Sequence, residues 1–200
     1  MHSDKRALSA WAVYAAVTLA AAAEVCCAAS AAPTNANWRI DPAHTEIAFS
    51  IDAIGYPKTK GAFRKFDGKI SINLNQPEKS AVAFHVQSGS VDVGSSAFGD
   101  YLRSAAFLDS SRFPSIDFVS TSVQKVSDHE VKVSGELTLL GVTKPLSVNV
   151  AVKRLPAGGG QRFSFEALAD IDRLAFGMNS GFPLVSKDVE LRISSEAAEL

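Results

Sequence analysis

Apolar and polar residues alternate in a pattern that recurs from residue 38 to residue 193. A period of two is typical of a β-strand with one buried face, because successive side chains point to opposite faces of a sheet. Turn-forming residues such as Gly55-Tyr56-Pro57 separate the alternating stretches. About eight to ten strands joined mainly by short turns predict an antiparallel sheet. The alternation runs through residues 47–51, 70–74, 82–86, 116–118, 131–133, 137–139, 146–152, 163–165 and 189–193.

A sheet of this size must protect its edges, and closure into a barrel removes them altogether. We therefore predict an all-β fold, an antiparallel β-barrel of about eight strands. The stretch 95–108 breaks the period of two, because Phe98, Leu102 and the alanines after them recur at spacings of three or four. This predicts one amphipathic helix, capped by Ser95 or Ser96 and ended by the stretch 109–114, which covers an open end of the barrel or packs on its wall.

The first residues differ in composition from the rest of the chain. Lys5 and Arg6 precede an uncharged, alanine-rich run over residues 7–23, and small residues follow up to Ala31. This order is typical of a secretory signal peptide, and we expect residues 1–31 to be cleaved. Residues 32–37 are then expected to form a short flexible N-terminus before a barrel domain over residues 38–200. The expected location is the periplasm or the exterior of the cell.

Two other interpretations of the leader remain open. A transmembrane anchor would need about 20 strongly apolar residues, and the alanine-rich run is shorter than that. A lipoprotein would carry its lipid on Cys26 or Cys27, but Val25 precedes the first of them where a small residue is normally required. Cleavage after Ala31 would leave a domain without cysteine, which its core alone must stabilise.

Residues with obvious chemistry are scarce after the leader. The formal net charge of -1 offers no basic patch for nucleic acid. His44, His85 and His129 are far apart in the sequence, and neither a metal motif nor a G-x-S-x-G nucleophile motif occurs. We expect no metal, no cofactor and no catalytic residue, and therefore no enzyme.

The chain instead has many large apolar side chains. All 12 phenylalanines lie beyond the leader, starting with Phe49. Barrels of about eight strands are either filled by their own side chains or hold one small ligand. Counting residues does not decide between a packed interior and a cavity.

Several segments resemble the YceI-like family of secreted lipid-binding proteins, in the order in which that family carries them. They are WRIDPAHTEIAFSI at 38–51, GAFRKFDGKISINL at 61–74, SVDVGSSAFGDYLRSAAFLDSSRFPSIDF at 90–118, GELTLLGVTKPLSV at 135–148, DRLAFGM at 172–178 and DVELRISSEA at 188–197. Each piece is weak alone, but together they span almost the whole chain after the leader and are specific.

The resemblance implies a lipocalin-like barrel with a helix beside it. Its lumen would hold a long apolar chain, such as a polyisoprenoid, an isoprenoid quinone or a fatty amide, so the expected function is that of a periplasmic binding or carrier protein. The alternative is a non-catalytic, stress-related accessory protein with a packed barrel that acts through a membrane or protein partner. An apolar lipid is the expected partner; a transient contact with the inner membrane and a homodimer are left open.

The resemblance also suggests site residues. Five polar residues in the matching segments are candidates for a polar mouth, although we favour a structural role for each, such as a pair within the helix or a turn held by His44. They are Asp41, His44, Asp100, Arg103 and Arg173. For the apolar wall we expect Phe49, Ile51, Phe63, Phe84, Phe118, Leu137 and Phe165, although the alternation does not say which face of the sheet is the lumen.

The chain departs from the family pattern at two places. Members of the family commonly carry a histidine where this chain has Ala53, and an Arg-Asp-x-His run where it has Gly99-Asp100-Tyr101. The polar end of the expected pocket is therefore altered, whereas the strand pattern supports the apolar part.

Overall fold

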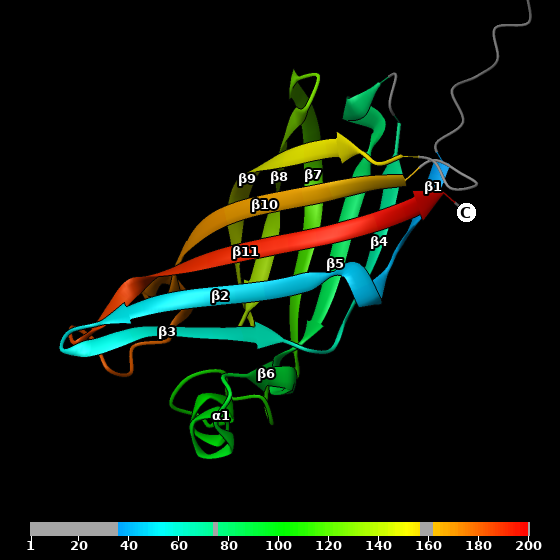
Figure 1. Ribbon diagram of the computed structural model, residues 1–200. Coiled ribbons are helices and arrows are strands. Elements are labelled where there is room, and N and C mark those ends of the chain that lie inside the picture. Colours follow the sequence, from blue (N-terminus) through cyan, green and yellow to red (C-terminus); the bar gives the residue numbers. More distant parts are fainter. Residues whose placement is uncertain (1–35, 74–75, 157–161, 200) are drawn as a thin grey trace, which may run out of the picture. The chain divides into compact units, whose positions relative to one another are not determined.

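The computed structural model describes residues 36–73, 76–156 and 162–199. Within these ranges the chain forms eleven strands that belong to a single antiparallel sheet (Figure 1). The strands are β1 (Ala36–Ile40), β2 (Glu46–Ala53), β3 (Tyr56–Phe63), β4 (Phe66–Ile72), β5 (Ala81–Gln87), β6 (Val91–Asp92), β7 (Ser115–Ser127), β8 (Glu130–Leu139), β9 (Val142–Arg154), β10 (Arg162–Asp172) and β11 (Val185–Glu199). The expected signal peptide and most of the expected flexible N-terminus lie outside the described residues, and β1 begins at Ala36.

The sheet closes on itself through its first strand. β1 pairs with β4 on one side and with β11 on the other, so the order β1-β4-β5-β7-β8-β9-β10-β11 returns to its start. β2 follows β1 along the same long strand β11, and β3 pairs with β2 before the chain continues into β4. If β1 with β2 and β3 with β4 are each counted as one bent strand, the closed sheet has the expected eight positions. The predicted antiparallel barrel is confirmed.

Three strands lie outside the alternating stretches of the sequence, namely β1, β3 and β6, and β3 is the longest of them. β3 has the sequence YPKTKGAF, which lacks the alternation of apolar residues and contains Pro57. Proline cannot donate a backbone hydrogen bond and is normally confined to the edges of sheets. β3 pairs with β2 along its length, but among the described residues its other edge pairs only with β6, at Ala62 and Phe63. Pro57 therefore lies in a stretch of free edge.

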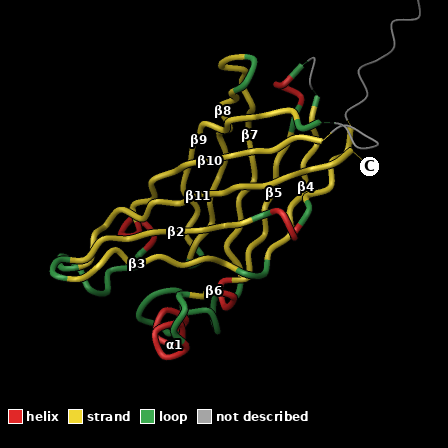
Figure 2. Tube along the Cα trace, viewed as in Figure 1, coloured by secondary structure: helices red, strands yellow, loops and turns green. Residues whose placement is uncertain are grey.

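The predicted helix is present but shorter than expected. α1 spans Ser96–Arg103, and the side chain of Ser95 caps it by accepting a hydrogen bond from the backbone N–H of Phe98. The hydroxyl of Ser104 donates to the carbonyl of Tyr101 at 2.6 Å, and a side chain that binds a terminal carbonyl in this way competes with further helix. The remaining residues up to Leu108 form turns. Figure 2 shows that strands make up most of the described chain.

Two small apolar clusters lie at opposite ends of the barrel. The first, near α1, consists of Val91, Leu108, Leu137, Leu139, Phe176 and Met178. The second lies where β1 closes the sheet and consists of Trp38, Ile40, Ile70, Phe163 and Ala197. The rings of Trp38 and Phe163 meet edge to face, with centroids 5.2 Å apart. Many inward side chains between the two clusters are only partly buried.

Candidate ligand-binding lumen

The barrel encloses a cavity of about 1010 Å³. This volume lies at the upper end of the range of about 300–1,000 Å³ that is usual for small-molecule sites. Val131 and Leu139 both line the cavity and lie eight residues apart on β8, so the lumen follows that strand for roughly 27 Å. A site of this length suits a long chain better than a compact molecule.

The period-two alternation of the sequence builds the wall of the lumen. From Leu146 to Val152 every second residue of β9 points inward, and all four of these side chains are only partly buried because empty space lies in front of them. The described residues therefore form a hollow barrel, not the packed interior of the alternative hypothesis. The inward sets are Ile47, Phe49, Ile51 and Ala53 on β2, Val131, Val133, Leu137 and Leu139 on β8, Leu146, Val148, Val150 and Val152 on β9, Phe163, Phe165, Ala167, Ala169 and Ile171 on β10, and Val189, Leu191 and Ile193 on β11.

The structure places all seven side chains expected in the apolar wall on the surface of this cavity. Phe84, Phe118 and Leu137 are direct cross-strand neighbours and form one row across β5, β7 and β8. The rings of Phe49 and Phe63 lie on the neighbouring strands β2 and β3, with centroids 5.6 Å apart. Ile51 and Phe165 complete the set.

Three of these phenylalanines lie over glycines of the neighbouring strand. A β-carbon on Gly61 would approach the ring of Phe49 to 2.5 Å, and one on Gly135 would approach the ring of Phe118 to 2.6 Å. A β-carbon on Gly68 would meet the ring of Phe84 at 3.1 Å. The missing side chains let the rings lie against the wall, which keeps space in the lumen free. These glycines could not be recognised from the sequence, because their role depends on strand register.

Arg173 lies at one end of the lumen but faces its own loop. The side chain is 1% exposed, and it donates hydrogen bonds to the carbonyls of Ser186 at 2.7 Å, Ser180 at 2.8 Å, Val185 at 3.0 Å and Met178. Burial lowers the pKa of the guanidinium, and the carboxylate of Asp172 opposes this shift. Arginine nevertheless stays protonated in proteins. Its geometry is that of a brace for the segment between β10 and β11.

The other four candidates for the polar mouth do not line the lumen. Asp41 accepts a hydrogen bond from the backbone N–H of Ala43 at 3.0 Å and lies 2.7 Å from Nδ1 of His44, so the two residues stabilise the turn between β1 and β2. The hydrogen bond between them lowers the pKa of Asp41 and raises the pKa of His44. Arg103 binds Asp100 at 2.7 Å within α1 and donates to the carbonyl of Val91 at 2.9 Å, which ties the helix to β6.

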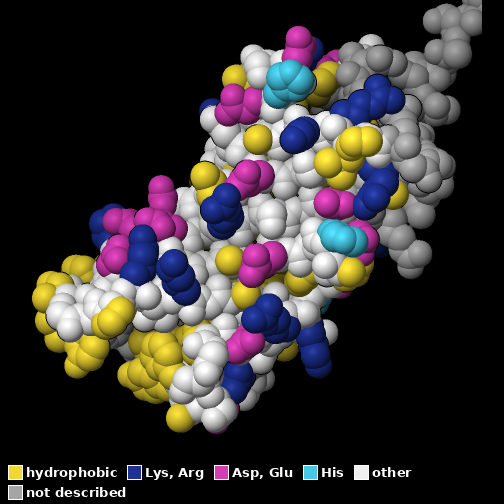
Figure 3. All heavy atoms as spheres, viewed as in Figure 1, with side chains coloured by type: hydrophobic (Ala, Val, Ile, Leu, Met, Phe, Trp, Pro, Cys, Tyr) yellow, Lys and Arg dark blue, Asp and Glu magenta, His cyan; other side chains and the backbone are white. Residues whose placement is uncertain are grey.

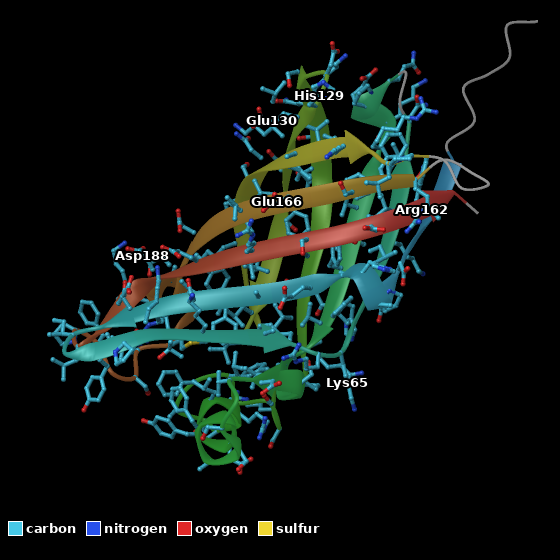
Figure 4. All side chains as sticks on the ribbon, in the orientation of Figure 1. Lys65, His129, Glu130, Arg162, Glu166 and Asp188 are labelled. Carbon is cyan, nitrogen blue, oxygen red and sulfur yellow. The ribbon has the colours of Figure 1, made fainter. Side chains whose placement is uncertain are left out.

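The two ends of the lumen differ in polarity. The end at the β7–β8 hairpin, which lies away from α1 in Figure 4, carries exposed polar side chains that were not among the candidates for the polar mouth. At the α1 end the lining side chains Tyr56, Phe98 and Tyr101 are aromatic. The members of this polar set are close together in the sequence except for Arg154, which joins them from the end of β9. The set comprises Lys125, Ser127, Asp128, His129 and Arg154.

Neither a metal site nor a membrane-spanning helix is found in the part of the chain that the structure describes. Among the described residues, no three His, Cys, Asp or Glu side chains lie close enough together to hold a metal ion. A search of the same residues for a helix with the length and apolar character needed to cross a membrane finds none. A hollow antiparallel barrel with an apolar wall is the architecture of small barrels that enclose a single ligand.

Comparison with known proteins identifies the particular family. The model of the YceI-like domain matches residues 38–197, so this chain belongs to the YceI-like family. Protein YceI of Salmonella arizonae is 36% identical over 170 residues, which cover 82% of this chain and 87% of that protein. The resemblance seen in the sequence is thereby confirmed.

Solved structures share the fold at lower sequence identity. Burkholderia cenocepacia BcnA superposes with a TM-score of 0.73 at 22% identity, over 78% of this chain and 98% of that one. A polyisoprenoid binding domain from Saccharophagus degradans, implicated in plant cell wall breakdown, superposes with a TM-score of 0.67 at 16% identity. That alignment covers 84% of this chain and the whole of the Saccharophagus domain.

Proposed function

We propose that this protein is a non-catalytic periplasmic carrier that holds one long apolar chain, of the polyisoprenoid, isoprenoid quinone or fatty amide class, in the barrel lumen. The observation that carries the proposal is the apolar cavity of about 1010 Å³. Every methylene buried in such a wall contributes about 0.8 kcal/mol, so a chain with about ten buried methylenes gains on the order of 8 kcal/mol before it loses its own freedom. The wall needs no charged group to provide this affinity.

Two further observations support the proposal. The Saccharophagus domain with the same fold is a polyisoprenoid binding domain, which favours a ligand of this class here as well. The alanine-rich leader over residues 1–31 supports export, and the periplasm is where an exported carrier could move a lipid. The accessory-protein alternative requires a packed barrel, and the cavity disfavours it.

The direct test is to identify what the purified protein contains. We expect native mass spectrometry of protein isolated without detergent to show a bound lipid of defined mass, and solvent extraction to release it. Refolded, lipid-free protein should take up ubiquinone or a polyprenol at a ratio of one per barrel. A barrel that is always empty and takes up neither compound would contradict the proposal.

A further inference from the structure

Six large apolar side chains are exposed around the α1 end of the lumen. They come from three separate segments: the tip of the β2–β3 hairpin, the helix α1, and the segment between β10 and β11. We call this set the apolar rim: Ile54, Tyr56, Phe98, Tyr101, Phe182 and Leu184. Figure 3 shows hydrophobic side chains gathered over the β2–β3 hairpin and between that hairpin and α1.

Only some of these exposed side chains also line the lumen. Tyr56, Phe98 and Tyr101 line the cavity as well as the surface, but Ile54, Phe182 and Leu184 do not touch it. Ile54 is 71% exposed and Leu184 is 63% exposed. Large exposed apolar patches mark surfaces that contact a protein or a membrane, or grooves that bind a ligand.

The fold holds these side chains in position. The backbone N–H of Ile54 donates to the carbonyl of Leu184 at 2.8 Å, which ties the β2–β3 turn to the segment before β11. The buried guanidinium of Arg173 binds carbonyls on both sides of Phe182 and Leu184, including those of Ser180 and Val185. These bonds fix the backbone of the segment and leave its two large apolar side chains in solvent.

The charges behind the rim are present in both signs and are paired. Nζ of Lys58 lies 2.8 Å from Glu190 and 3.5 Å from Asp52. Nζ of Lys187 lies 2.9 Å from Asp188 and 3.7 Å from Asp172. Lysines engaged in this way do not form the unpaired basic cluster that anionic lipids require. A belt of neighbouring positive and negative groups instead complements zwitterionic phospholipid headgroups, which also carry both signs.

We propose that the apolar rim is a membrane-docking surface, which seats the α1 end of the lumen on a zwitterionic phospholipid bilayer. Tyrosine side chains favour the level of the headgroups, and the aliphatic and phenylalanine tips enter the acyl boundary below it. The purpose of docking rests on the proposed carrier function, because a long apolar chain that moves directly between bilayer and lumen avoids water. The docking itself depends only on the rim.

The test is flotation of the purified protein with vesicles of phosphatidylcholine alone and with vesicles that also contain phosphatidylglycerol. We expect the protein to float with both kinds of vesicle, to a similar extent at low and high salt. Insertion of the apolar rim into the bilayer, and not attraction between charges, drives the binding. The double variant Ile54→Ser with Leu184→Ser should partition into either vesicle at least about tenfold less, because it loses two apolar tips.

The matched control carries two exposed apolar residues that lie away from the rim. Leu168 on β10 is 62% exposed and Val126 on β7 is 55% exposed, and neither lines the lumen. The variant Leu168→Ser with Val126→Ser should float like the unmodified protein. Circular dichroism checks that both variants fold, and uptake of a fluorescent long-chain fatty acid from solution should be the same in both.

Each contrary result has a clear meaning. Failure of the unmodified protein to float, or equal flotation of the rim and control variants, overturns the docking proposal. So does a dimer in analytical ultracentrifugation that the rim variant abolishes while vesicles bind neither form, because the rim would then contact a second copy. If flotation behaves as expected but no barrel takes up ubiquinone or a polyprenol, the docking surface stands and the carrier proposal fails.

Discussion

Individual aromatic residues determine how much of the barrel interior stays free. Phe49, Phe84 and Phe118 fit against the wall because a glycine lies beneath each ring. The alternation of the sequence predicts that these phenylalanines share one face of the sheet, but it does not predict the glycines beneath them. Gly68 is paired with Phe84 through the register of β4 and β5. The alternation within one strand does not show which residue of the next strand will lie beside it.

The charged side chain of Arg173 has a structural role, because it binds backbone carbonyls. We expect Arg173→Ala to lower the free energy of unfolding by about 3 kcal/mol or more, because it leaves one buried and three partly buried carbonyls without their donor. Urea unfolding measures the change. Arg173→Lys should recover only part of the loss, since an ammonium group cannot reproduce the planar fork of guanidinium donors.

Arg162 provides a matched control for this prediction. It pairs with Glu196 at 2.6 Å in a part of the barrel where both side chains are considerably more exposed. Arg162→Ala should therefore change the unfolding free energy by only about 0–1 kcal/mol. A similar loss in the Ala variants of both arginines would refute the role of Arg173 as a brace.

The pair formed by Asp41 and His44 predicts a pH dependence. The hydrogen bond from Asp41 raises the pKa of His44 above 6.5, so the stabilisation from this histidine is complete below 6.5 and is lost as the pH rises through its folded value. The same bond lowers the pKa of Asp41 below 3.8, so the contribution of the aspartate is lost as the pH falls through that lower value. The pair is therefore most effective between these limits.

Titration of the His44 ring by NMR checks this interpretation. In the unmodified protein the ring should titrate above its ordinary range, and Asp41→Asn should return it towards 6.5. An identical titration curve in the variant would show that another group raises the pKa.

Among the secondary-structure elements, those with an amphipathic pattern could be predicted and those defined by pairing could not. The alternating stretches correspond to strands, and the helical spacing around Phe98 corresponds to α1. β3 could not be predicted from the sequence. Pro57 is typical of a turn, and the polar residues next to it interrupt the alternation of apolar and polar residues. The two-residue strand β6 exists only because it pairs with Ala62 and Phe63 of β3.

A larger side chain on the inward face of β10 should occupy part of the lumen. Ala167 points into the cavity between Val150 and Ile193, its cross-strand neighbours. Ala167→Phe should reduce uptake of long chains, since the ring occupies their space, while the unfolding free energy changes by less than about 1.5 kcal/mol because the ring enters a void. Uptake of a fluorescent long-chain fatty acid and urea unfolding measure the two effects.

The neighbouring residue controls for the added bulk. Leu168 points outward on the same strand, so Leu168→Phe should leave uptake unchanged. If the Ala167→Phe variant binds long chains as well as the unmodified protein, the ligand does not occupy this part of the lumen.

At the scale of the whole molecule, the sequence could not show whether the barrel is hollow. The same phenylalanines could fill a core or line a cavity, because apolar content is equal in both cases. What differs is how far the strands hold opposite walls apart, which depends on closure through β1 and β11. The sequence also could not show whether the charged candidates bind a ligand. Asp100 and Arg103, for example, form an ion pair with each other within the helix.

Ligand binding should stabilise the whole barrel. At a ligand concentration one hundred times the Kd, binding adds about 2.7 kcal/mol, which for a chain of this size raises the Tm by roughly 5–10 °C. Differential scanning calorimetry with polyprenols of increasing length should show a shift that grows with length until the lumen is full. A short-chain alcohol that shifts the Tm as much as a long one would argue against a lumen-length ligand.

The closure through β11 also affects the timing of folding. β11 pairs with β10, β2 and β1, and it is the last strand along the described chain. The barrel therefore cannot close during synthesis until these residues have left the ribosome, and its first and last strands must then meet across most of the sequence. Contacts of such long range form slowly. A chain with this topology therefore has no closed barrel until synthesis has passed β11.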